Sequence, residues 1–249
     1  MASRRAVAAI PARYASTRFP GKPLVPILGL PMIAHVVARA IEAGCFAEVL
    51  VATDDDRIAA AATAAGARAV MTGEASSGTD RVAQAVRDIE ADVVVNVQGD
   101  EPALPPGNLQ KITTLLLDHP DMAMATLALA GTSGDLASPN VVKVVTDLAG
   151  RALYFSRAGI PFQRQASPEL IRRHVGIYAF QRETLFRFAS LPEVAIERAE
   201  GLEQLRALAH GIPLQVLDVT ESSVGVDVPG DVPLAEEALL TLFARKDHP

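Results

Sequence analysis

The sequence predicts an α/β fold with a central mixed, mostly parallel sheet covered by helices on both faces. Over the first hundred residues, strand-like and helix-like segments alternate, as they do in parallel sheets. The strand-like segments there are continuous apolar runs, which is typical of strands buried on both faces. The second half is richer in strand candidates, so the sheet should be mixed. The 249 residues, 49% of them hydrophobic, suffice for one large core.

The first half should contain four strands separated by three helices. The strands are expected at 6–11, 48–53, 68–72 and 91–102, and the helices at 32–43, 54–67 and 76–89. In 32–43 the apolar residues recur on one helical face, and Gly44 should end this helix. The acidic residues that open the second helix suit the positive end of its dipole.

In the second half, strands are expected at 122–130, 141–147, 151–157, 173–180, 213–219 and 223–228. The segment 146–152 (TDLAGRA) has the composition of a hairpin turn. Helices are expected at 197–211, closed by Gly211, and at 231–246. We therefore expect one domain over residues 1–249, with a β-rich insertion at about 130–180.

Composition excludes several classes of protein. The net charge of −6 and the aromatic content of 4% disfavour a nucleic-acid-binding module. The single cysteine, Cys45, cannot form an internal disulfide, which fits a reducing compartment. No apolar stretch approaches the roughly 18 residues that a membrane span needs, and the first residues lack a cleavage-site pattern. We expect a cytoplasmic protein without membrane contact.

Three cations, Arg13, Arg18 and Lys22, lie in one loop directly after the first predicted strand. Ligands bind at such strand ends in α/β sheets, and Arg and Lys suit phosphate oxygens. Gly21 permits close approach of the backbone. The loop matches neither the Walker A pattern nor GxGxxG. The alternative is a solvated basic loop, but its position favours a triphosphate site.

Two aspartates are candidate metal ligands. Asp100 follows Gly99 at the end of a buried predicted strand, and Asp227 ends another predicted strand. Two carboxylates with phosphate oxygens suit Mg²⁺, a hard octahedral ion. The alternative is that each aspartate caps a helix or turn. Glu101 should point to the opposite side of the strand and is not predicted as a ligand.

Seven strings occur together in one order along the chain. They are PARYASTRFPGKPL (11–24), SGTDR (77–81), VNVQGDEP (95–102), LYFSR (153–157), RHVGIYAF (173–180), LEQLR (202–206) and GVDVPGD (225–231). From about residue 6 to residue 240, the chain resembles the CMP-sugar synthetases, and among them the 3-deoxy-manno-octulosonate (Kdo) cytidylyltransferases. It departs from the family at 163–171, where the loop is shorter than expected. The resemblance implies a three-layer nucleotide-diphospho-sugar transferase-like fold whose β-rich insertion serves dimerisation and sugar binding.

The resemblance also implies roles for individual residues. The nucleotide-binding set is Ala12, Arg13, Arg18, Lys22, Ser77, Gly78, Thr79 and Arg81. The sugar-binding set is Gln98, Arg157, His174, Tyr178, Glu203 and Gln204. The metal ligands are Asp100 and Asp227, and the catalytic set is Arg13, Lys22, Asp100 and Asp227. Other interpretations from the residues alone are a helix cap at 76–79, a core histidine at 174, and a solvated helix face at 203–204.

The predicted reaction follows from this resemblance. The anomeric hydroxyl of Kdo would attack the α-phosphate of CTP, with Mg²⁺ as cofactor, giving CMP-Kdo and pyrophosphate. CMP-Kdo would serve lipopolysaccharide synthesis, and the resemblance implies a homodimer. Two alternatives stay open: the same reaction with another acidic sugar, such as sialic acid or an amino analogue of Kdo, and a nucleotide-binding regulator without catalysis.

Overall fold

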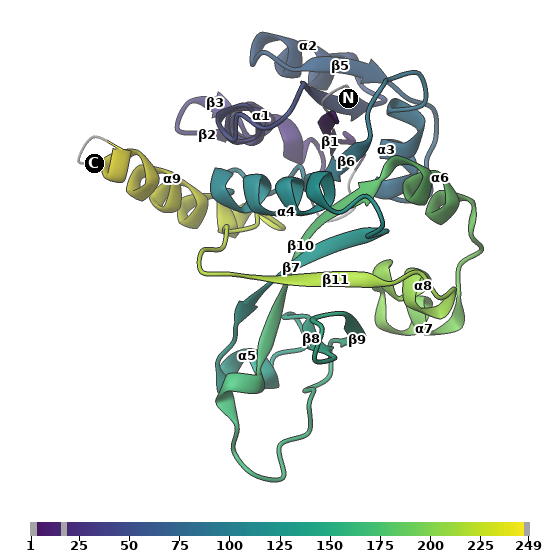
Figure 1. Cartoon of the computed structure of the whole chain (residues 1–249). Coiled ribbons are helices and arrows are strands. Elements are labelled where there is room, and N and C mark those ends of the chain that lie inside the picture. Colours follow the sequence, from purple (N-terminus) through teal and green to yellow (C-terminus); the bar gives the residue numbers. More distant parts are fainter. Residues whose placement is uncertain (1–3, 16–18, 247–249) are drawn as a thin grey trace.

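One large sheet lies at the centre of the molecule (Figure 1). The computed structural model describes residues 4–15 and 19–246, and within these residues nine strands join in this sheet. The main path runs in the order β11-β7-β10-β6-β1-β4-β5. The strands are β1 (Ala6–Pro11), β4 (Glu48–Thr53), β5 (Arg68–Met71), β6 (Val93–Asn96), β7 (Met124–Ala130), β8 (Lys143–Thr146), β9 (Ala152–Ser156), β10 (Arg172–Gln181) and β11 (Leu214–Val219).

The sheet is mixed, as the sequence predicts. Strands β6, β1, β4 and β5 pair in parallel, and so do β7 and β11. Strand β10 is antiparallel to both β6 and β7 and thereby joins the two parallel groups. Because β6, β1 and β4 run the same way, their carboxyl ends meet at one edge of the sheet.

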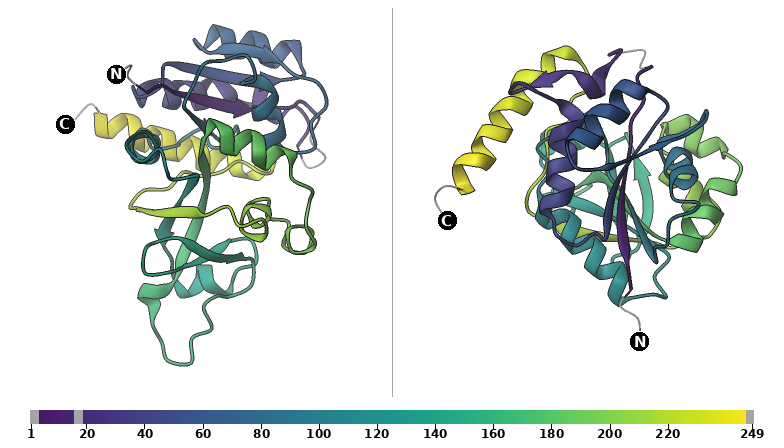
Figure 2. Two further views of the ribbon diagram at one scale, coloured as in Figure 1. Left: turned by 45° about the vertical axis from the view of Figure 1, so that its right-hand side comes forward. Right: turned by 90° about the horizontal axis from the view of Figure 1, so that it is seen from above.

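Helices cover both faces of the sheet and make three layers (Figure 2). Alternate residues of β1 divide between two cores: Ala8 and Ile10 pack into one, and Val7 and Ala9 into the other. The first core is covered by α1 (Met32–Glu42), α2 (Asp56–Ala64) and α4 (Pro106–Asp118). The second is covered by α3 (Gly78–Ala85), α6 (Arg182–Ser190) and α8 (Gln204–Ala209). A strand apolar on both faces is the expected result of this double cover.

A third, smaller core attaches the last helix to the body. Helix α9 (Val232–Lys246) packs beside the hairpin of β2 (Pro26–Ile27) and β3 (Leu30–Pro31). Ala235 and Leu239 of α9 contact a cluster that includes Ile27, Met32 and Val226. The cluster therefore ties the loop before α9 to the loop after β1.

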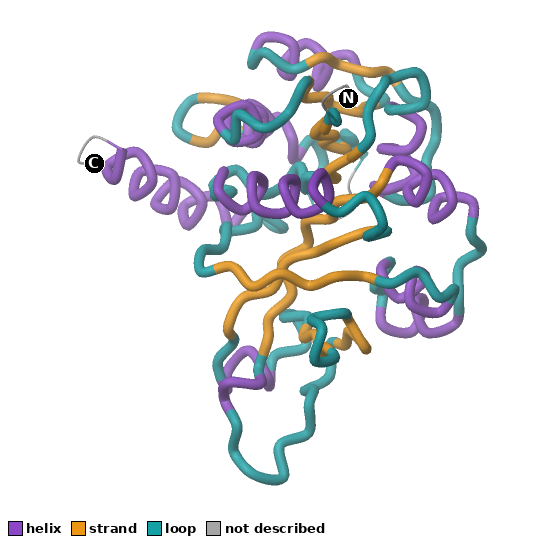
Figure 3. The backbone as a smooth tube through the Cα atoms, in the orientation of Figure 1, coloured by secondary structure: helices purple, strands orange, loops and turns teal. Residues whose placement is uncertain are grey.

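The segment between β7 and β10 forms a lobe that extends away from the two helical layers (Figures 1 and 3). It holds α5 (Ser133–Ala137), the β8–β9 hairpin and a short 3₁₀ turn at Pro168–Leu170. The hairpin turn at 146–152 is confirmed: the Asp147 carboxylate accepts hydrogen bonds from the backbone of Ala149 and Arg151. Strand β10 pairs with β8 at Arg173 and with β6 at Tyr178, so one strand connects lobe and sheet.

The prediction of one helix over 197–211 is wrong. The structure has two helices there, α7 (Ala195–Glu200) and α8, separated by a turn at Gly201. Gly201 ends α7 with a φ of 62°, in the left-handed region. Glycine adopts this conformation without a steric penalty and commonly ends helices.

The prediction of a strand at 223–228 is also wrong. Its apolar residues alternate as in a strand, but the segment is a loop beside the 98–101 turn. One backbone hydrogen bond, from Val226 N to Asp100 O (2.9 Å), holds it there, and no described strand forms a ladder with it. The strand predicted at 91–102 is shorter than expected, because β6 ends at Asn96. Helices α4 and α6 were not predicted.

The break at Gly201 allows a test of backbone conformation alone. A Cβ at this position would meet no heavy atom within 4 Å, so only the positive φ opposes a side chain. We expect Gly201→Ala to lower the free energy of unfolding by about 1 kcal/mol in a denaturant titration. Gly107→Ala in α4, equally free of close neighbours, should instead be neutral or raise it by about 0.5 kcal/mol. Equal effects of the two substitutions would contradict this explanation.

Candidate active site

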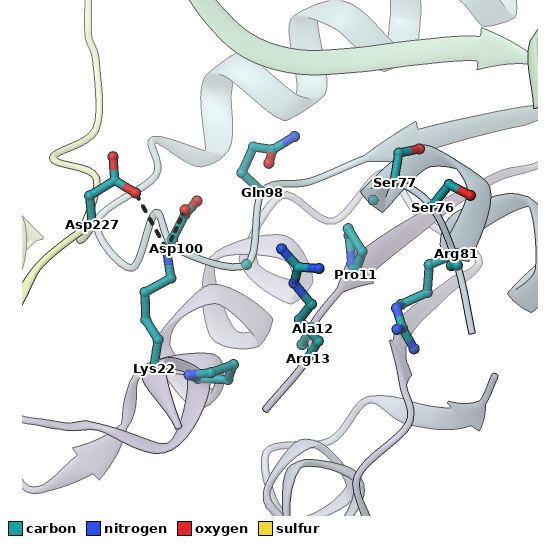
Figure 4. A pocket seen from close by; sticks show the side chains of 14 residues that line it. Pro11, Ala12, Arg13, Lys22, Ser76, Ser77, Arg81, Gln98, Asp100 and Asp227 are labelled. Carbon is teal, nitrogen blue, oxygen red and sulfur yellow. Dashed lines mark hydrogen bonds and ion pairs between the residues drawn. The ribbon is translucent and has the colours of Figure 1, made fainter. Parts of the chain in front are cut away.

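A cavity of about 280 Å³ lies at the carboxyl ends of β1 and β6 (Figure 4). This is the edge of an α/β sheet at which ligands commonly bind. The lining residues come from the loops after β1 and β6, the first turn of α3 and the loop before α9: Pro11, Ala12, Arg13, Lys22, Pro23, Ala75, Ser76, Ser77, Gly78, Arg81, Gln98, Gly99, Asp100 and Asp227.

Close backbone packing forms the floor of this cavity. The turn after β6 passes so near β1 that a Cβ on Gly99 would lie 2.8 Å from the carbonyl oxygen of Pro11. Such a distance would force the backbone to move, so glycine is required there. Ala12 is buried and donates its N–H to Ala52 O of the neighbouring strand (2.9 Å). Glycine at 99 therefore determines how closely the Asp100 turn approaches the cationic loop.

Lys22 contacts both candidate metal ligands. Its Nζ lies 2.7 Å from Asp100 Oδ2 and 3.6 Å from Asp227 Oδ1 (Figure 4). The Asp227 loop is fixed from its own side, because Asp231 Oδ2 accepts the backbone N–H groups of Asp227 and Val228 at 2.8 and 2.9 Å. Asp100 lies in a turn beyond β6, and Asp227 lies in a loop, so neither ends a strand as predicted.

The two aspartates have the donor set and the convergence that a Mg²⁺ site requires. Both carboxylates approach one cation, the Lys22 ammonium, from different loops. No cluster of three or more His, Cys, Asp or Glu side chains suited to a metal occurs in the described ranges 4–15 and 19–246. Two carboxylates plus substrate phosphates are typical of Mg²⁺, which rarely uses an all-protein cage. These residues fit the ion.

The opposite wall of the cavity is the start of α3. Ser77 caps this helix, since its Oγ accepts the N–H of Asp80 (3.1 Å), and Gly78 begins it. The helix N-terminus adds a partial positive charge that favours anions. Arg81 lines the cavity while its guanidinium is held by Thr72 Oγ1 (2.5 Å) and Asp54 Oδ2 (2.7 Å). Arg13 is exposed and lies between this wall and Lys22 (Figure 4).

Thr79 does not line the cavity, unlike the other described members of the predicted nucleotide set. Its side chain is buried and points under α3, where Asn96 Nδ2 donates to Thr79 Oγ1 (3.0 Å). The Thr79 hydroxyl in turn donates to the carboxylate of Glu203. Thr79 thus joins the nucleotide side of the site to a predicted sugar residue. Arg18 lies outside the described residues.

Glu203 is a partly buried carboxyl group at the turn before α8. Burial raises its pKa, and hydrogen bonds from the Thr79 and Ser77 side chains oppose that rise. Its neighbour Gln204 is only 3% exposed, and its Nε2 has no hydrogen-bond partner among the described residues. An unsatisfied buried amide costs free energy unless a ligand or water completes it. The solvated helix face considered from the sequence is excluded for Gln204.

His174 and Tyr178 lie on the same face of β10, as expected from their spacing. Their ring centroids are 5.5 Å apart, and His174 also packs edge-on against Phe155 of β9 (4.9 Å). Burial lowers the pKa of His174 to about 3, so the ring is neutral at physiological pH. One hydrogen bond, between Nε2 and Thr126 Oγ1 (2.9 Å), orients it.

Gln98 and Arg157 occupy different positions relative to these rings. Gln98 lines the cavity, and its Cγ would lie 3.9 Å from a Cβ at Gly176 of β10, so it connects the cavity to that strand. Arg157 follows β9 in the lobe, is exposed, and does not line the cavity. The structure therefore places Gln98 at the cavity, links Glu203 to α3 through Thr79, and places Arg157 in the lobe.

Some residues of the site were not predicted. Ser76 and Gly99 line the cavity, and Asp231 holds the Asp227 loop. The glycine before Asp100 was the available signal for a close backbone approach. Glu101, which was not predicted as a metal ligand, has a buried Oε2 without a hydrogen-bond partner in the described chain, and burial together with Asp100 raises its pKa to about 7.

Comparison with known proteins identifies the class first. A sequence model of the family described as cytidylyltransferase matches residues 7–222. Within this class, the chain is 51% identical to the 3-deoxy-manno-octulosonate cytidylyltransferase of Myxococcus xanthus, covering 95% of this chain and 97% of the relative. The enzyme of the same name from Escherichia coli is 45% identical, covering 90% and 92%. The chain belongs to the family of 3-deoxy-manno-octulosonate cytidylyltransferases.

A solved structure agrees with this assignment. CMP:2-keto-3-deoxy-manno-octonic acid synthetase, determined in complex with CTP, superposes with a TM-score of 0.91 at 42% identity. The match covers 95% of this chain and 99% of that protein. Among the described residues, no helix is long and apolar enough to cross a membrane. The three-layer fold expected from the resemblance is confirmed.

The partly buried His174 predicts a pH dependence of stability. In the folded state the pKa of His174 is about 3 against an ordinary value of 6.5, so the unfolded chain binds its proton first as the pH falls. The free energy of unfolding is therefore unaffected by His174 above pH 6.5. Below pH 6.5 protonation of this side chain in the unfolded state lowers the free energy of unfolding, by about 2 kcal/mol at pH 5. Denaturant titrations at pH 7 and 5 should show wild type losing about 2 kcal/mol more than His174→Gln. Equal losses would mean that His174 is accessible to protons.

Proposed function

We propose that this protein transfers CMP from CTP to the anomeric hydroxyl of Kdo, releasing pyrophosphate. The observation that carries the proposal is the contact of Lys22 with Asp100 and Asp227 in a cavity opposite the N-terminus of α3. The names of relatives at 45–51% identity and the CTP-bound neighbour support the choice of substrates. The attacking hydroxyl and the leaving pyrophosphate require charge stabilisation rather than a covalent intermediate.

The chain supplies cations to one end of the nucleotide and hydrogen-bonding groups to the other. Arg13 and Lys22 would neutralise the triphosphate, while Ser77, Gly78 and Arg81 would contact the cytidine side. Mg²⁺ bound by Asp100 and Asp227 would stabilise phosphate charge and favour ionisation of the attacking hydroxyl. Lys22 would then leave its carboxylate partners and contact phosphate oxygens. Mg²⁺ would replace the Lys22 ammonium group beside Asp100 and Asp227, so the negative charge of the two carboxylates would stay compensated.

The buried groups around β10 would bind the sugar. Glu203 and Gln204 present a carboxylate and an unsatisfied amide, and neutral His174 and Tyr178 add polar edges to an apolar wall. Such groups suit a polyhydroxylated substrate, since each hydroxyl can donate and accept. Gln98 lies between the two substrates, and Arg157 would pair with the sugar carboxylate.

The wider role is part of the same proposal. CMP-Kdo would supply lipopolysaccharide synthesis, the protein would act in the cytoplasm, and it would form a homodimer. The lobe exposes the large apolar side chains of Leu153, Phe162 and Leu170, at 61%, 90% and 52%. A second copy that covers these residues is consistent with a dimer through the lobe.

The proposed reaction is tested by measuring pyrophosphate release from CTP. Purified protein with Mg²⁺ should release pyrophosphate when Kdo is added. This release should stop when the metal is chelated. Sialic acid and an amino analogue of Kdo, supplied in parallel, decide whether another acidic sugar is the better substrate. No release above background with any of these sugars would reject the proposal and favour a nucleotide-binding regulator.

The two aspartates give a sharper prediction. We expect Asp100→Asn and Asp227→Asn each to lower kcat by about 100-fold or more, because each removes a ligand that stabilises transition-state charge. CTP binding, measured by calorimetry, should lose its enhancement by Mg²⁺, yet stay equal or become tighter without metal, since a carboxylate repels the triphosphate. Lys22→Met should weaken CTP binding in both conditions.

Asp121→Asn serves as the matched control for these variants. Asp121 is exposed and precedes β7, at the opposite end of the sheet from the cavity. It should behave like wild type in both assays. Full Mg²⁺ enhancement in the Asp100→Asn and Asp227→Asn variants would show that the ion binds elsewhere.

A further inference from the structure

Arg157 is held by one residue, Glu200, at two points. Glu200, the last residue of α7, accepts the backbone N–H of Arg157 at Oε2 (2.9 Å) and the hydroxyl of Ser156 at Oε1 (2.6 Å). The backbone carbonyl of Glu200 also accepts Arg157 Nε (2.9 Å). The hydrogen bond from the Ser156 hydroxyl and, to a smaller extent, that from the Arg157 backbone lower the pKa of the Glu200 carboxyl group, so it is ionised at neutral pH. Both the backbone and the side chain of Arg157 are thus fixed by one residue.

Lys143 holds the other side of the same residue. Its side chain is fully buried, and Nζ donates to the carbonyl oxygens of Ser138 (2.8 Å), Val141 (2.6 Å) and Arg157 (2.5 Å). An ammonium group has three donors, and here all three are used. Burying a charge is costly unless it is compensated in this way. The N–H of Arg157 is therefore bound by an anion and its C=O by a cation.

This arrangement leaves part of the guanidinium available. Nε is engaged by Glu200, and Nη1 makes one longer contact with Pro139 O (3.3 Å). Arg157 is exposed, and its Nη2 forms no hydrogen bond with any residue in the described part of the chain. A guanidinium with a fixed plane and free donors is suited to a carboxylate, because less conformational freedom is lost on binding.

The turn that carries Glu200 also reaches the nucleotide side of the site. Gly201 follows Glu200, and two residues later Glu203 accepts the hydroxyl of Thr79, next to the helix cap of α3. The four-residue turn 200–203 therefore contacts β9 at one end and α3 at the other. It connects the position of Arg157 to that of the nucleotide helix.

We propose that Glu200, together with Lys143, is a positioning residue that orients Arg157 to bind the carboxylate of the acidic sugar. The inference rests on the proposed function and adds to it two residues that do not touch the substrate. A general role in folding of the lobe would predict equal effects on both substrates. A positioning role predicts an effect on the sugar alone, because CTP binds at the other end of the site.

The test compares single and double variants in the full-length enzyme. We expect Glu200→Gln to raise KM for Kdo by about tenfold while KM for CTP changes by less than about twofold. Arg157→Ala should raise KM for Kdo at least as much. The double variant Glu200→Gln/Arg157→Ala should have the same KM for Kdo as Arg157→Ala alone, because Glu200 acts only through Arg157. Ser156→Ala, a milder change, should raise the same constant by about threefold, and only when Arg157 is present.

Asp147→Asn is the matched control. Asp147 also accepts backbone N–H groups and binds an arginine, Arg151 (2.8 Å), but it does so at the far turn of the β8–β9 hairpin. The Asp147→Asn substitution should lower thermal stability without changing KM for Kdo or KM for CTP. If Glu200→Gln fails to fold, the Ser156→Ala result in the two backgrounds decides the question.

The possible outcomes separate the two proposals. Equal changes in both KM values, or effects of Glu200→Gln that add to those of Arg157→Ala, would overturn the positioning role. An unchanged KM for Kdo in Arg157→Ala, with normal turnover in wild type, would also overturn it while the proposed reaction stands. Absence of turnover in wild type would overturn the proposed reaction, and this inference with it.

Discussion

The contact of one lysine with two aspartates organises this site, because each of the three residues comes from a different part of the chain. Lys22 follows the first strand, Asp100 follows β6, and Asp227 precedes the last helix. The like charges at 100 and 227 repel each other, and the Lys22 ammonium group that contacts both offsets this repulsion. Three other features hold the three loops close together. They are the glycine at 99, the hydrogen bond from Val226 to Asp100 and the small core under α9.

In the proposed function, the two strand directions of the sheet would separate the binding regions of the two substrates. The parallel strands β6, β1 and β4 end together and present loops with backbone N–H groups and cations, which suit a triphosphate. The antiparallel strand β10 runs from the lobe to the centre and presents side chains along its length, which suit a sugar with many hydroxyl groups. Thr79 and Glu203 meet where these two regions join. The mixed sheet would thus place two kinds of binding surface side by side, as the proposed reaction of two substrates requires.

Much of the fold could be predicted from periodicity and turn residues. Apolar runs located the buried strands, and Gly44 marked the end of α1 with a φ of 64°. Failures occurred where local pattern and tertiary environment disagree. The segment 223–228 alternates like a strand but finds no ladder partner, and Gly201 interrupts a helix whose flanks have helical composition. Local sequence does not specify which backbone groups a distant segment will satisfy.

The same limit applies to the site. Residue type and position made Lys22, Asp100 and Asp227 candidates beside a capping alternative for the aspartates, and the family resemblance assigned all three to the site. The family resemblance implied that Thr79 lies by the nucleotide, together with Ser77 and Gly78, and in the structure the Thr79 side chain is buried and bonded to Asn96. The contacts of Glu200 and Lys143 with Arg157 depend on how α7, β8 and β9 lie relative to one another, and no local sequence pattern specifies this.

The attachment of α9 has a consequence for biosynthesis. Val226 is buried against Ala235 and Leu239, so the loop bearing Asp227 lacks its packing partners until those residues have been made. A ribosome-bound chain that has exposed all earlier strands still has the cationic loop and Asp100 without the second acidic residue. The nascent chain therefore cannot hold both carboxylates at the ammonium group before α9 has been made.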